Sequence, residues 1–186
     1  MKAMKRVFSV LITLCVLLFL FSGCSSSNFH INETIKKYYN LSSEEEKAIL
    51  DFAEKYENFH EQLREAEQTK DLDTWARLSV EMLDDYRTLQ ETYLDSIAAE
   101  IRSSLKQYNS DGKESEEIGL LALDMLGVDT CCINLSGDCR NYELNGKSEG
   151  AVEDMVGSAE ELFVSFLDVF TQEGSELWLS EHGTID

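Results

Sequence analysis

The stretch that decides the fold is "DTWARLSVEMLDDYRTLQETYLDSIAAEIRSSLKQY", residues 73–108. Large apolar side chains recur along it every three or four residues: Trp75, Leu78, Met82, Tyr86, Leu89, Tyr93, Ile97, Ile101, Leu105 and Tyr108. Their mean spacing of about 3.7 residues is close to the 3.6-residue period of an α-helix. The chain contains no proline, so the pattern predicts one long, uninterrupted amphipathic helix.

A second helix is predicted just before this one. Ser42 with Glu45, or Ser43 with Glu46, fits a capping box, in which a hydroxyl and a carboxylate each satisfy an unpaired backbone N–H. The apolar residues that follow keep a heptad spacing: Ile49, Phe52, Tyr56, Phe59, Leu63 and Ala66. A short polar turn at residues 69–71 then leads into the long helix, which predicts an antiparallel pair.

Two further helices are predicted after "NSDG" at residues 109–112, a strong stop signal. Ser115 is expected to cap a short helix that ends at Gly127 and buries Ile118, Leu121, Ala122 and Met125. Residues 131–150, "CCINLSGDCRNYELNGKSEG", read as an irregular connection. The last helix is expected to start at Ser148 or Glu149 and to bury Val152, Met155, Ala159, Leu162, Phe163, Phe166 and Phe170. The predicted fold is all-α: an antiparallel helical bundle of about four helices, residues 42–186, with one long Cys-containing connection.

The N-terminus is organised like a secretory signal. Three cationic residues in the first six precede an apolar run at residues 7–21, which is too short for a transmembrane helix of about 20 residues. The small pair Ser22-Gly23 then precedes Cys24. The motif Phe21-Ser22-Gly23-Cys24 resembles the lipobox of bacterial lipoproteins, with phenylalanine where leucine is usual. The resemblance covers residues 1–27, and no family is recognised for the domain beyond.

This resemblance implies a lipid anchor. Residues 1–23 would be removed as a signal peptide, and Cys24 would carry a diacylglyceryl group, with fatty acyl chains such as palmitate. Two acyl chains anchor a protein stably, whereas one binds only marginally. Residues 24–41 would form the lipidated cysteine and a tether, and the protein would sit at the extracytoplasmic face of the cell membrane.

The charge of the chain restricts its partners. It carries 36 acidic and 16 basic residues, a net charge of −20. Removal of residues 1–23, which hold three cations and no acid, leaves −23. Such a surface repels nucleic-acid phosphate and anionic lipid, so we expect no nucleic-acid partner. A basic envelope protein or a divalent cation would be attracted.

The candidate site consists of Cys131, Cys132 and Cys139, the only thiols after Cys24. In an exported protein, a disulfide from Cys139 to Cys131 or Cys132 is the first expectation. A β-hairpin turning at residues 136–138 would instead hold these thiols apart, and free buried thiols are another alternative. Metal binding is a further one. Asp129 or Asp138 could complete a ligand set, but the C-C-x₆-C spacing does not demand it and no histidine is nearby in the sequence.

No catalytic motif is present. Glu57-x-x-His60 occurs once and lies beside the apolar seam, whereas a di-iron bundle needs two such motifs. We therefore predict a non-catalytic protein-interaction module of the cell envelope, anchored in the lipid bilayer through Cys24 and without a cofactor. The alternative is a metal-binding or redox-responsive lipoprotein that uses Cys131, Cys132 and Cys139.

Overall fold

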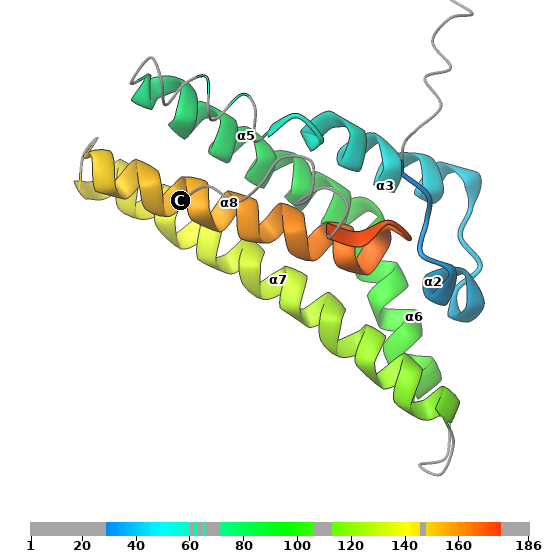
Figure 1. The fold of residues 1–186 in the computed structure, drawn as a ribbon. Coiled ribbons are helices and arrows are strands. Elements are labelled where there is room, and N and C mark those ends of the chain that lie inside the picture. The colour runs from blue at the N-terminus through cyan, green and yellow to red at the C-terminus, as the bar shows by residue number, and fades with distance from the viewer. Residues whose placement is uncertain are drawn as a thin grey trace, which may run out of the picture.

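The predicted all-α fold is confirmed. The computed structural model describes residues 29–59, 62, 65, 71–105, 113–145 and 148–175. In these residues the long helical segments run alternately in opposite directions, so that α3, the α5–α6 rod, α7 and α8 form an antiparallel bundle (Figure 1). The helices are α2 (Glu33–Tyr38), α3 (Ser43–Tyr56), α5 (Leu72–Leu89), η1 (Gln90–Leu94), α6 (Asp95–Leu105), α7 (Lys113–Asn145) and α8 (Glu149–Phe170).

The long helix predicted from residue 73 onward is present as the continuous rod α5–η1–α6. Asp71 caps its start, where the Thr74 N–H donates to Asp71 Oδ1 at 3.1 Å. The η1 segment is π-helical, because the Asp95 N–H bonds the Gln90 carbonyl five residues back. The hydroxyl of Thr92 donates to the carbonyl four residues earlier at 2.6 Å, a contact that bends helices.

The predicted capping box of α3 is confirmed at Ser42 and Glu45. The Glu45 N–H donates to Ser42 Oγ at 3.2 Å, and the Ser42 N–H donates to Glu45 Oε2 at 2.7 Å. Ser148 caps α8 in a similar way, accepting from the Ala151 N–H at 3.2 Å. Both helices therefore start where the sequence predicts.

The predicted short third helix and long connection are wrong. α7 does not end at Gly127 but continues as one helix to Asn145, and α8 begins four residues later. A glycine inside a helix costs only about 1 kcal/mol. Burial of Val128 and Leu135, both 0% exposed, offsets this, since each buried aliphatic side chain contributes about 1.5–3 kcal/mol.

Part of the segment predicted as a tether, residues 24–41, packs against the bundle. Phe29, Ile31 and Ile35 are buried in the core, and Ile31 forms an antiparallel bridge with Thr171 at the end of α8. The Asn32 N–H donates to the Phe170 carbonyl at 3.0 Å. The globular part of the chain therefore includes Phe29, because these apolar residues and backbone bonds attach it to α8.

Aromatic residues from α3, α5 and α8 form the centre of the core. The Phe166 ring lies 4.6 Å from that of Phe52, 6.4 Å from Tyr86 and 4.9 Å from Phe170, centroid to centroid. Tyr86 and Phe166 are at most 1% exposed. The helices are thus joined by an interior packed with rings.

Candidate functional site

The three cysteines lie on one helix, and the predicted disulfide is wrong. Cys131, Cys132 and Cys139 are all free and all within α7. Residues seven apart on a helix are about 10 Å apart along its axis, beyond the roughly 4.4–6.8 Å between the Cα atoms of a disulfide. The hairpin alternative is wrong for the same reason: the segment is helical.

The free buried thiols were the alternative that the structure supports. Cys132 and Cys139 are 6% and 8% exposed and face the core. Burial raises the pKa of both thiols, that of Cys139 to about 11. Cys131 is half-buried, with its Sγ 3.4 Å from Ser165 Oγ of α8. In the part of the chain that the structure describes, no three His, Cys, Asp or Glu side chains converge as a metal site would require.

A half-buried carboxylate, Asp129, joins α7 to the long rod. Gln90 Nε2 donates to Asp129 Oδ1 at 2.7 Å, and the Tyr86 hydroxyl lies 3.4 Å from the same oxygen. Burial raises the pKa of the Asp129 carboxyl, and nearby Asp95 raises it further. The sequence indicated Asp129 only as a possible metal ligand next to an irregular connection, although its spacing from Met125 and Cys132 fits the inner face of a helix.

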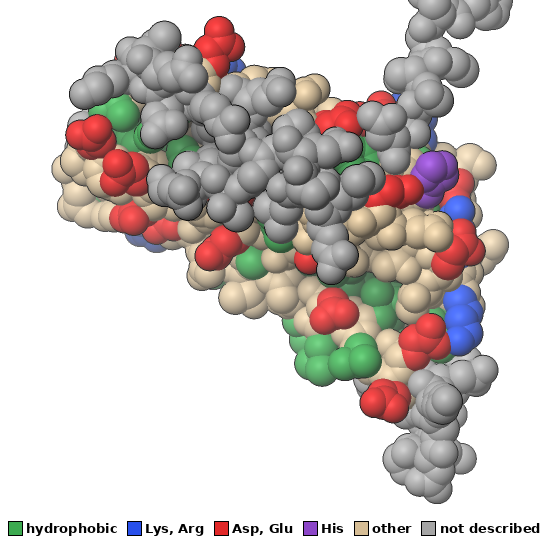
Figure 2. All heavy atoms as spheres, in the orientation of Figure 1, with side chains coloured by type: hydrophobic (Ala, Val, Ile, Leu, Met, Phe, Trp, Pro, Cys, Tyr) green, Lys and Arg blue, Asp and Glu red, His purple; other side chains and the backbone are tan. Residues whose placement is uncertain are grey.

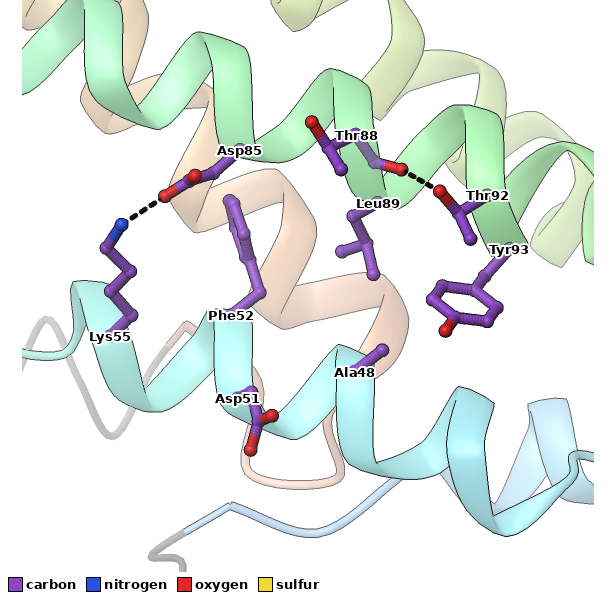
Figure 3. A pocket seen from close by; sticks show the side chains of 9 residues that line it. All are labelled: Ala48, Asp51, Phe52, Lys55, Asp85, Thr88, Leu89, Thr92 and Tyr93. Atoms are coloured by element: carbon purple, nitrogen blue, oxygen red, sulfur yellow. Dashed lines mark hydrogen bonds and ion pairs between the residues drawn. The ribbon is translucent and has the colours of Figure 1, made fainter.

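One hollow of about 400 Å³ lies between α3 and the rod. Figure 3 shows Phe52 and Leu89 pointing toward one another between the two helices, with Lys55 and Asp85 paired across one end. Its remaining lining residues are Ala48, Asp51, Thr88, Thr92 and Tyr93. The hollow therefore combines an apolar floor with hydroxyls and carboxylates, and its Tyr93 end is formed by the π-helical segment.

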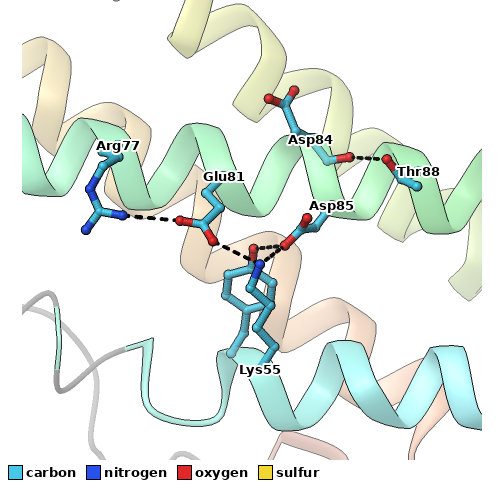
Figure 4. Close-up of polar contacts among 7 residues, drawn as sticks. Lys55, Arg77, Glu81, Asp84, Asp85 and Thr88 are labelled. Carbon is cyan, nitrogen blue, oxygen red and sulfur yellow. Dashed lines mark hydrogen bonds and ion pairs between the residues drawn. The ribbon is translucent and has the colours of Figure 1, made fainter.

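A polar network borders this hollow (Figure 4). Lys55 pairs with Asp85 and, at 2.9 Å, with Glu81, which also accepts from Arg77 at 3.2 Å. The hydroxyl of Tyr56 donates to Asp85. Hydrogen bonds to Asp85 and Glu81 raise the pKa of Lys55. This network fixes α3 against α5, and its two cations, Lys55 and Arg77, balance its two carboxylates, Glu81 and Asp85.

A second hollow of about 540 Å³ adjoins the first along α5 and shares Asp85 with it. Its lining residues are Asp73, Ala76, Arg77, Val80, Glu81, Asp84, Asp85 and Tyr142. Four of these are carboxylates and one is a cation. The side of α5 between α3 and Tyr142 is therefore an acid-lined groove with an apolar floor, which no sequence motif indicated.

Several sequence-predicted features lie outside the described residues. They are the signal peptide and lipobox with Cys24, His60 of the Glu57-x-x-His60 motif, Leu63 and Ala66 of the heptad pattern, and Tyr108 with the stop signal at residues 109–112.

Comparison with known proteins gives no relative from which to transfer a function. No protein-family model, no curated protein and no solved structure matches this chain.

By length and composition, residues Glu116–Asn145 of α7 are apolar enough to cross a membrane. The core helix of a soluble protein meets the same criterion. In α7, 39% of the 18-residue stretch that meets it is buried inside the fold.

Proposed function

We propose that the protein is a lipid-anchored, extracytoplasmic interaction module that binds a basic partner rather than catalysing a reaction. The anchoring part rests on the sequence Phe21-Ser22-Gly23-Cys24. Phe29 is already packed in the core, five residues after Cys24. Five residues reach at most about 18 Å, so an acylated Cys24 would keep the bundle close to the bilayer.

The observation that carries the binding part is the acid-lined groove along α5. The second of its two adjoining hollows is lined by the exposed carboxylates Asp73 and Asp84 together with the apolar residues Ala76 and Val80. A lysine or arginine side chain matches this arrangement, because its aliphatic stem packs on apolar surface while its charge meets a carboxylate. Charge of one sign in a groove also accelerates encounter with an oppositely charged partner.

Binding of this kind is modest for each contact. An exposed ion pair contributes about 0–1 kcal/mol and is weakened by salt. Anchoring compensates, because it raises the local concentration of the module at the membrane. The thiols supply no comparable surface, since Cys132 and Cys139 are buried.

Anchoring is tested separately from binding. The full chain is expressed in a bacterium and the membranes are separated. We expect the wild type to be acylated and membrane-bound, and Cys24→Ser to lose both properties. Equal membrane retention of Cys24→Ser and wild type would remove the lipoprotein assignment.

Binding is tested with the full chain in lipid nanodiscs, titrated with a lysine- and arginine-rich peptide at low and at physiological salt. Asp73→Asn/Asp84→Asn removes two exposed carboxylates of the groove. Glu153→Gln/Asp154→Asn is the matched control, because it removes the same charge from an exposed part of α8. We expect roughly five- to tenfold weaker binding for the groove variant and a much smaller change for the control. Equal losses in both would show attraction by net charge only, and the groove would not be the binding site.

A further inference from the structure

α7 carries two heptad seams on opposite faces, and the bundle uses only one of them. The inner seam packs into the core and consists of Ile118, Leu121, Met125, Val128, Cys132, Leu135, Cys139 and Tyr142. The outer seam keeps the same alternation of three- and four-residue steps, and every member is exposed: Leu120, Leu123, Gly127, Thr130, Asn134, Gly137, Asn141 and Leu144. A repeat of 3.5 residues is the pattern by which one helix packs along another.

The outer seam and its borders hold five of the six large apolar side chains that the described residues expose. Leu123, Ile133 and Leu144 are 63%, 70% and 72% exposed, and Leu120 is 55% exposed. Among the large apolar side chains that the described residues expose, only Val80 lies outside α7. Figure 2 shows hydrophobic side chains gathered at the surface in the lower part of the view, where α7 runs.

The outer seam is also free of charge along its whole length. From Leu120 to Leu144 it extends for about 36 Å, at 1.5 Å per residue, in a chain of which 28% of the residues are charged. Two glycines, Gly127 and Gly137, lie within the outer seam. A Cβ added at either would meet nothing within 4 Å. These glycines leave open notches where another helix can approach the backbone closely.

Charge decides between the occupants of this face. Helices that lie on membranes carry lysine and arginine on their polar side and aromatic residues on the apolar side, whereas α7 has neither arrangement and belongs to a chain of net charge −20. A basic partner would gain nothing from an uncharged seam. A second copy of this acidic chain, by contrast, meets least repulsion where neither surface carries charge.

We propose that the outer seam packs against the outer seam of a second copy, which makes the protein a homodimer. The seam is self-complementary in both orientations. In the parallel one each residue meets itself. In the antiparallel one Leu120 meets Leu144 of the second copy, Leu123 meets Asn141, Gly127 meets Gly137, and Thr130 meets Asn134.

The contact has the size of a reversible interface. A strip about 36 Å long and about 12 Å wide on each copy corresponds to roughly 900 Å² in total, near the lower limit of about 1,000 Å² for specific interfaces. The dimer is therefore concentration-dependent, and confinement to a membrane surface strengthens it.

The test uses the full chain, in mild detergent and in membranes. Sedimentation of the wild type over a range of concentrations is expected to show a monomer–dimer equilibrium. Leu123→Glu is expected to weaken dimerisation at least tenfold, because each dimer gains two charges in the contact. Val80→Glu, the same change at the exposed apolar residue of α5, is the matched control and leaves the equilibrium unchanged.

A second measurement keeps the proposal testable if detergent dissociates the dimer. Thr130→Cys lies at the centre of the outer seam, so a short bis-maleimide is expected to link two copies in membranes in either orientation. Thr88→Cys, an exposed threonine of α5, and the wild type are not expected to link.

Three results would overturn the proposal. One is a monomer at every concentration together with no intermolecular link at Thr130→Cys. Another is a link within one chain, from the introduced thiol to Cys15, which would show that the chain's own apolar segment covers the seam. The third is quenching of a label at Thr130→Cys by brominated lipid without dimer formation, which would assign the seam to the bilayer.

Discussion

Replacement of Phe166 by alanine tests the packing of the core most directly. The Phe166 side chain is 0% exposed, and its ring contacts Phe52 of α3 and Phe170 of α8 at centroid distances of 4.6 and 4.9 Å. Truncation of a buried phenylalanine costs about 3–5 kcal/mol. Loss of the aromatic pairs adds to the cost of removing apolar surface from the core, so we expect a loss of unfolding free energy in the upper half of that range. For a chain of this size, 1 kcal/mol shifts the melting temperature by about 2–4 °C, which gives a decrease of roughly 8–20 °C.

Thermal unfolding followed by circular dichroism at 222 nm measures this decrease. Val80→Ala is the control, because Val80 is 38% exposed, lies outside the outer seam, and surface truncations change stability by less than about 0.5 kcal/mol. A decrease below about 3 °C for Phe166→Ala, or equal decreases for both variants, would contradict the buried position of α8 between α3 and α5.

Three further predictions concern local features. Without reductant, a maleimide at pH 7 should modify Cys131 of the folded chain first. Burial raises the pKa of the Cys139 thiol to about 11, so Cys139 should react at least tenfold more slowly until the chain is unfolded. Equal rates of modification at the two thiols would contradict the burial of Cys139. Asp129→Asn should raise the melting temperature at pH 7. Burial raises the pKa of this carboxyl. Its contribution to stability is therefore complete below the ordinary aspartate pKa and is lost as the pH rises through the folded-state pKa, so the higher melting temperature of Asp129→Asn should disappear on acidification toward pH 3. An increase in melting temperature that is independent of pH would show another cause. Ser42→Ala removes the capping hydroxyl of α3 and should cost about 1 kcal/mol in denaturant unfolding, an effect that Ser42→Asp should largely avoid.

Periodicity was sufficient for helices that bury a single face. The apolar stripe that starts at Trp75 predicted the rod, and the capping box at Ser42 predicted the start of α3. The π-helical segment within the rod was not predicted. It depends on backbone bonds shifted by one residue near Thr92, and such a shift leaves no trace in apolar spacing.

The failure at α7 has a different physical origin. The inner seam continues past Gly127 through Val128, Cys132 and Leu135 at regular helical steps, so the signal for a continuous helix was present. Apolar residues on the opposite face obscured it, because a helix that is apolar on two sides shows no single amphipathic face. Glycines and paired cysteines then made a loop seem reasonable, yet Gly127 is helical and the thiols pack in the core.

The groove along α5 could not be predicted, because it exists only when α3 and α7 flank α5. Asp85 and Tyr142 are 57 positions apart in the sequence and border the same hollow. An acidic chain contains many carboxylate pairs, and only the packing of helices decides which of them share an apolar floor.

The two proposed surfaces are compatible because they lie on different helices: the groove runs along α5, and the outer seam runs along α7. Tyr142 belongs to the inner seam and borders the groove, whereas the outer seam faces away from it. Dimerisation through the outer seam therefore leaves both grooves accessible and places two of them on one particle. Two linked sites bind a multivalent basic partner 10²–10⁴-fold more tightly than one site does, whereas a partner with a single basic segment gains nothing. On an anchored chain, weak binding in each groove and weak dimerisation would thus combine to give selective binding of extended or repetitive basic surfaces. This combination would give the exposed leucines of α7, which lie outside the core of the monomer, a role in binding.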